Sequence, residues 1–93
     1  MSALSDDAES TRRETLHELG LGEDELRKSH GPGSLGCHEA LHTAALLLRA
    51  VDGELLEHPA ILATPEWFAL AHRAHAALFD LYQAIGAGHS QEK

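Results

Sequence analysis

Two stretches decide the fold of this chain: LGCHEALHTAALLLRAVDGELLE at residues 35–57 and PEWFALAHRAHAALFDLYQAIG at residues 65–86. Both carry apolar residues at alternating spacings of four and three, which places those residues along one face of an α-helix. The first stripe is Cys37, Leu41, Ala44, Leu48, Val51 and Leu55, and the second is Trp67, Ala71, Ala74, Leu78, Leu81 and Ile85. Because the link between the two stretches is short, we expect an all-α fold built on an antiparallel helical hairpin.

Capping residues and helix breakers mark the ends of both helices. Ser34 is placed to cap the first helix, and the His58-Pro59 pair ends it, since the residue before a proline resists helical geometry. Thr64 and Pro65 begin the second helix, and Gly86 and Gly88 are expected to stop it after Ile85. Residues 31–93 therefore form the hairpin domain, with a loose tail after the second helix.

Residues 1–30 form an acidic N-terminal arm. They hold eight acidic and four basic residues and few large apolar ones. Ser5 can cap a short helix through about Leu19, Gly20 and Gly22 stop it, and residues 23–28 can form one further turn. Because the apolar face is so thin, we expect this helix to be weak and the arm to be mobile or to become ordered on a partner.

Composition excludes several classes of function. The 93 residues make one domain at most, and 15 acidic against 7 basic residues give a net charge of −8, which argues against nucleic-acid binding through phosphates. No apolar run is long enough to cross a membrane, and the N-terminus lacks the pattern of a signal peptide. A single cysteine, Cys37, leaves no internal disulfide. We therefore expect a cytoplasmic protein that contacts neither nucleic acid nor membrane.

The apolar surface exceeds what one contact between two helices can cover. Beside the second stripe runs an aromatic–histidine stripe, which consists of Phe68, His72, His75, Phe79 and Tyr82 with Trp67 at its head. An exposed stripe of this kind on a small domain is typical of an interface. We expect a homodimer in which two hairpins form a four-helix bundle. The alternatives are a monomer whose arm covers the stripe and the capture of a different protein.

One short motif suggests chemistry. The string His38-Glu39-Ala40-Leu41-His42 matches H-E-x-x-H and resembles the zinc-binding helix of the zincin metalloproteases. The resemblance implies that His38 and His42 bind zinc and that Glu39 is the general base. It covers these residues alone, and the third ligand and the edge strand that zincins need are not visible in the sequence. Since chance places such a string in roughly 7% of shuffled versions of this chain and the other zincin features are not visible, we predict no enzymatic activity and no cofactor.

Metal binding without catalysis is a separate hypothesis, because His38 and His42 share one helix face. If facing positions of the hairpin add up to about 121, His38 lies opposite Gln83, and His72 and His75 lie roughly 12 Å too far along the hairpin to join it. Glu39 or His89 is then the candidate for a further ligand of zinc or another divalent transition metal.

The sequence thus predicts a small acidic helical protein that acts, without catalysis, as a protein-interaction or regulatory accessory module. The first alternative is a metal-binding protein that uses His38 and His42. The second is an acidic inhibitor whose arm, at residues 5–25, occupies a basic site on its partner.

Overall fold

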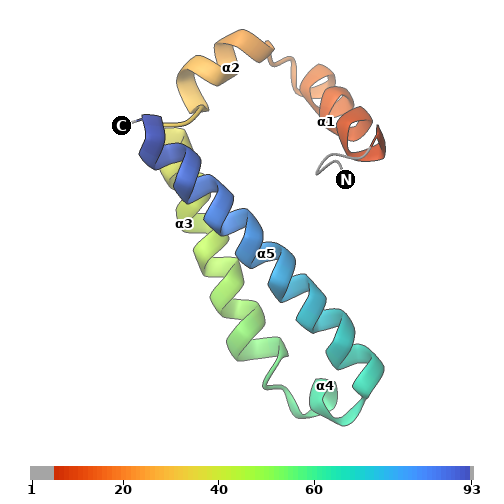
Figure 1. Cartoon of the computed structure of the whole chain (residues 1–93). Coiled ribbons are helices and arrows are strands. Elements are labelled where there is room, and N and C mark those ends of the chain that lie inside the picture. The colour runs from red at the N-terminus through yellow and green to blue at the C-terminus, as the bar shows by residue number, and fades with distance from the viewer. Residues whose placement is uncertain (1–5, 93) are drawn as a thin grey trace.

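The computed structural model describes residues 6–92, and the side chains up to Ser90. Every element in this range is helical and no strand occurs in it, so the all-α prediction is confirmed. The elements are α1 (Asp6–Leu19), α2 (Glu23–His30), α3 (Leu35–Ala50), the π-helical turn η1 (Val51–Leu55), α4 (Pro59–Ala63) and α5 (Pro65–Glu92). The helices α3 and α5 lie side by side and antiparallel, α4 closes one end, and α2 leads away from the other (Figure 1).

Local chemistry explains where the first three helices stop and start. Gly20 and Gly33 adopt the left-handed backbone region, with φ of 68° and 88°, at the two turns that follow α1 and α2. Ser34 caps α3 as predicted, because its Oγ accepts a hydrogen bond from the Cys37 N–H at 3.1 Å. The expected cap of α1, Ser5, lies outside the described residues.

The predicted end of the second helix is wrong. α5 continues through Gly86 and Gly88 and ends at Glu92, and the tail expected to be loose is helical. A glycine inside a helix costs only about 1 kcal/mol relative to alanine. Packing of the last turns offsets that cost, since His89 is buried and Gly86 lies close to Leu41 of α3.

The register of the hairpin also differs from the expected one. The residue numbers of facing positions add up to 127 rather than to the expected 121, since Asp52 faces His75 and His38 faces His89. The link between the helices is the cause. Instead of a plain loop it contains η1 and α4, and α4 packs against the start of α5. As a result, each residue of α3 faces a residue of α5 that lies about six positions later in the chain than the expected register gives.

The packed core is thin. Ala44 and Ala71, where α3 and α5 meet, are the buried apolar residues among those described, and no large side chain of the described part is fully buried. The radius of gyration is 16.0 Å, against about 12 Å for a compact chain of this length. No helix within residues 6–92 is both long enough and apolar enough to span a membrane. The chain is thus an elongated hairpin with an arm at one end (Figure 1).

Candidate functional site

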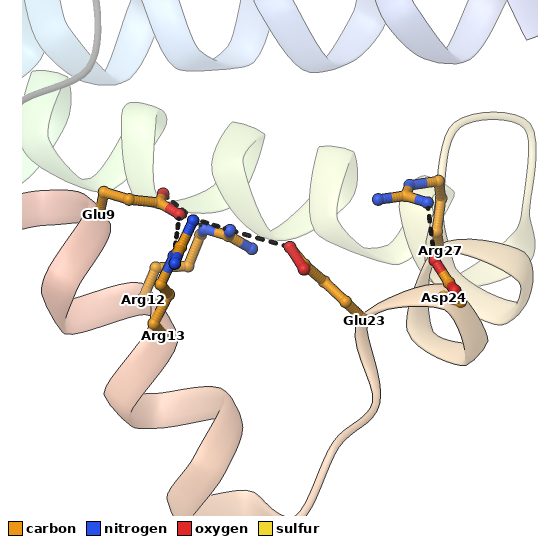
Figure 2. A network of polar contacts seen from close by, with 6 residues as sticks. All are labelled: Glu9, Arg12, Arg13, Glu23, Asp24 and Arg27. Carbon is orange, nitrogen blue, oxygen red and sulfur yellow. Dashed lines mark hydrogen bonds and ion pairs between the residues drawn. The ribbon is translucent and has the colours of Figure 1, made fainter.

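A network of charges joins α1 to α2 (Figure 2). Arg12 donates hydrogen bonds to both carboxylate oxygens of Glu9, at 2.8 and 2.7 Å, and Arg13 donates to Glu9 at 2.9 Å. Arg12 also reaches across the link between the two helices to Glu23, at 2.9 Å. The hydrogen bonds from Arg12, and then from Arg13, lower the pKa of Glu9 to about 2, and those to Glu9 and Glu23 raise the pKa of Arg12 above its usual range.

The arm does not cover the hairpin. α1 stands apart from α3 and α5 (Figure 1), so the monomer whose arm shields the aromatic–histidine stripe is not what the structure contains. Within the arm, Glu9 and Glu23 are engaged by Arg12, and Asp24 is engaged by Arg27 at 3.2 Å. A basic partner that used these three carboxylates would have to displace the arginines.

Histidines gather where the start of α3 meets the end of α5. His89 is 8% exposed, and its Nδ1 accepts a hydrogen bond from the Gly33 N–H at 3.0 Å. The ring of His38 lies beside it, with the two ring centroids 6.0 Å apart. His89 therefore ties the C-terminal part of α5 to the turn that precedes α3, a contact across 56 residues of chain.

The hydrogen bond of His89 bears on metal binding. A neutral imidazole that accepts at Nδ1 carries its proton on Nε2, so neither nitrogen offers a free lone pair to a metal. Binding a metal through Nε2 would move the proton to Nδ1, where it would meet the Gly33 N–H. His89 can join His38 in a metal site only if it gives up its bond to Gly33.

His38 and His42 are both exposed and line an open cavity of about 630 Å³ with Glu39 and Thr43. Within the described part of the chain, no group of three or more His, Cys, Asp or Glu side chains is arranged to hold a metal ion. This end of the hairpin thus presents a pair of histidines one helical turn apart.

The aromatic–histidine stripe divides between two environments. Phe68, His75 and Tyr82 are half-buried on the face of α5 that is turned toward α4, η1 and α3. Trp67, His72 and Phe79 are exposed. The division arises because the inward face of α5 runs between the two stripes that the sequence suggested and takes members from both.

Two contacts within this region had no counterpart in the sequence analysis. His75 Nε2 lies 3.9 Å from Asp52 Oδ1 across the hairpin. His72 stacks on Phe68, with ring centroids 6.1 Å apart, and both line an open cavity of about 690 Å³ with Leu62 of α4. The spacing of Tyr82, Ile85 and His89 continues the inward pattern beyond Gly86 and was the available signal for the longer helix and for a buried His89.

Comparison of the chain with protein-family models, with curated proteins and with solved structures found no significant match. A functional proposal therefore has to come from the residues and their geometry.

Proposed function

We propose that this protein is a non-catalytic interaction module, a regulatory accessory protein, that works as a homodimer. The observation that carries the proposal is the mismatch between apolar content and burial. Apolar residues make up 43% of the sequence, yet no large side chain of the described residues is fully buried. Leu35, Trp67 and Leu70 each expose more than half of their surface. A core this thin gains stability from a metal or from a partner subunit, because the single cysteine cannot form a disulfide within the chain.

The accessible surface supports the same proposal. The chain exposes 7256 Å² for a mass of 10.0 kDa, whereas compact monomers of that mass expose about 5,200 Å². Part of the excess of about 2,000 Å² belongs to α1, which stands apart. An interface of ordinary size buries about 800 Å² of each partner, so the excess surface is large enough to form one such interface.

The test is the solution mass of the purified protein by light scattering over a hundredfold range of concentration, with the metal content measured on the same sample. We expect a metal-free dimer whose melting temperature rises with protein concentration, because dissociation is coupled to unfolding. A monomer at every concentration, with a melting temperature that does not change, would refute the homodimer.

Metal binding is the second candidate, and the exposed pair of His38 and His42 on one helix face is the observation in its favour. Since one chain supplies this pair alone, we expect any ion to be shared between chains. About one zinc per dimer, lost in His42→Ala, would place the histidines rather than the apolar surface at the centre of the function.

A further inference from the structure

The hairpin has two sides, and helix geometry tells which residues lie on each. The buried and half-buried residues of α5 include Phe68, Ala71, His75, Leu78, Tyr82 and Ile85, and those of α3 include Cys37, Leu41, Ala44 and Leu48. One step along a helix rotates the side chain by about 100°. Because α3 and α5 face each other and run in opposite directions, the residues that directly precede inward positions lie on the same side of the hairpin in both helices.

The side formed by these preceding residues carries no charge. On α5 it consists of Trp67, Leu70, Ala74, Ala77, Leu81 and Ala84, all of them exposed. On α3 it consists of Gly36, Ala40, Thr43, Leu47 and Ala50, and α2 packs over its Gly36 end. We call this surface the apolar side. Its large members Leu47, Trp67, Leu70 and Leu81 expose 52%, 54%, 57% and 50% of their surface.

The opposite side is polar along α3 and mixed along α5. The residues that directly follow inward positions include His38, His42 and Arg49 on α3, and Asp52 on η1. On α5 they are Ala69, His72, Ala76, Phe79, Gln83 and Gly86. We call it the histidine side. On α3 the histidines and the charged residue beside the inward face lie on the histidine side. On α5 three large exposed apolar residues, Trp67, Leu70 and Leu81, lie on the apolar side, against Phe79 on the other. This contrast indicates that the apolar side is covered in the working protein.

We propose that the apolar side is covered by the apolar side of a second copy, with α5 packed antiparallel against α5 of that copy. The inference rests on the homodimer proposed above and adds the surface and the arrangement. A chain with a net charge of −8 repels its own copies. Gly36 and Ala40, at the α3 end of the apolar side, share a cavity with charged residues of the arm, whereas the α5 part offers a surface through which two copies can meet without bringing like charges into contact.

The pattern along α5 is self-complementary, which favours a second copy over a different protein. If two α5 helices cross antiparallel midway between Ala74 and Ala77, Trp67 faces Ala84 of the other copy. In the same arrangement Leu70 faces Leu81, and Ala74 faces Ala77. The largest side chain thus meets a small one at each end, and alanines meet at the crossing, where helix axes can approach to about 8 Å. A two-fold interface requires this kind of match of a surface with itself.

The test uses two neighbouring alanines. Ala77 lies on the apolar side and Ala76 does not, and both are exposed residues of α5. Ala77→Glu and Ala76→Glu therefore add the same charge and the same helix propensity at adjacent positions. We expect Ala77→Glu to weaken the dimer by at least about a hundredfold, because it buries unpaired charges. Ala76→Glu should keep the mass of the dimer, and circular dichroism checks that both variants stay helical.

The outcomes separate the two proposals. If the unmodified protein and both variants are dimers, the apolar side is not the interface, and the homodimer itself stands. If the unmodified protein is a monomer, both proposals fail. Loss of the dimer in Ala76→Glu but not in Ala77→Glu places the interface on the histidine side and overturns the inference.

A cross-link tests the arrangement even if Ala77→Glu fails to fold. In a Cys37→Ser background, Ala77→Cys places thiols on both copies close to the proposed two-fold axis, within reach of a disulfide. We expect Ala77→Cys to form a disulfide-linked dimer on mild oxidation and Ala76→Cys to stay monomeric on a non-reducing gel. Cross-linking by Ala76→Cys alone, or by neither variant, would exclude the antiparallel packing of α5 on α5.

Discussion

His89 illustrates how one residue fixes the geometry of this small fold. It is the buried polar residue of the described part, and it satisfies a backbone N–H at Gly33, where the chain adopts a left-handed turn. Protonation of its Nδ1 would remove the acceptor and set two donors against each other. The residue that the sequence suggested as a metal ligand is instead bound to the backbone at the start of the hairpin.

We expect His89→Ala to destabilise the protein by about 1–3 kcal/mol, since it leaves a part-buried N–H without its acceptor and removes a buried ring. His42→Ala is the matched control, because His42 is exposed, and it should change stability by less than about 0.5 kcal/mol. Urea unfolding followed by circular dichroism measures both. Equal losses in the two variants would mean that the bond to Gly33 does not form in solution.

Glu9 gives a prediction about acid. Its pKa is lowered from 4.5 to about 2 by the arginines of α1, so the folded arm binds this proton less readily than the unfolded chain does. The stabilisation by Glu9 is therefore fully present above about pH 4.5, decreases as the pH falls and is gone below about pH 2. We expect the amide hydrogens of α1 to exchange faster across this range.

The variant Glu9→Gln isolates that effect. It should loosen α1 already at neutral pH and lack the pH-dependent loss between pH 4.5 and 2 that Glu9 causes. Glu14→Gln, which changes a carboxylate of the same helix outside the network of Figure 2, serves as the control. If both variants follow the same pH profile as the unmodified protein, the network does not order the arm.

At the scale of the elements, the length of α5 is the main departure from expectation. Glycines near the end of an apolar pattern commonly stop a helix, but they do so by adopting a left-handed conformation. Gly86 and Gly88 do not adopt it, whereas Gly20, which follows α1, has a φ of 68°. Glycine therefore ends α1 but lies within the helix in α5. The difference is in the residues that pack against the turns that follow.

This difference predicts opposite effects of alanine. A methyl group at Gly86 would lie 3.7 Å from Leu41, an ordinary contact, so Gly86→Ala should stabilise the protein by about 0.5–1 kcal/mol through helix propensity. Gly20→Ala should destabilise the arm by about 1 kcal/mol, because its backbone is left-handed. Thermal unfolding and hydrogen exchange measure the two. If Gly86→Ala instead destabilised the protein, the result would support the shorter helix, ending at Ile85, that the sequence predicts.

For the whole molecule, the two candidate surfaces differ in their response to pH and salt. An interface made by the aromatic–histidine stripe would place imidazoles in an apolar contact, and protonating them would weaken it. The apolar side holds no histidine, and both copies are acidic, so protonation and added salt reduce the repulsion between them.

We therefore expect the dimer to tighten, by a few-fold in Kd, when the salt concentration rises from about 50 to about 500 mM. Protonation of histidines should not weaken the contact itself, because none of them lies on the apolar side. Analytical ultracentrifugation at several values of pH and salt measures both effects. Dissociation on mild acidification would favour the aromatic–histidine stripe, and His72→Gln, which cannot be protonated there, would then suppress it.

The sequence by itself determined that this chain is helical, where α1 ends, where α3 begins and which stretches pair. These features follow from local causes: the spacing of Cys37, Leu41 and Ala44, the cap at Ser34, and the positive φ of Gly20 and Gly33. Each can be read from a few neighbouring residues because hydrogen bonding within a turn and side-chain spacing act over short distances.

Only the tertiary structure decided the register, the end of α5 and the two unlike sides of the hairpin. The register depends on whether α4 folds, and the end of α5 depends on the bond between His89 and Gly33, which are far apart in the chain. The stripe that contains Trp67, Ala71 and Ala74 and the aromatic–histidine stripe differ by one residue in register, so periodicity could not say which residues of α5 point inward. Packing placed the inward face between the two stripes, because that face is set by what two helices bury together and not by either helix alone.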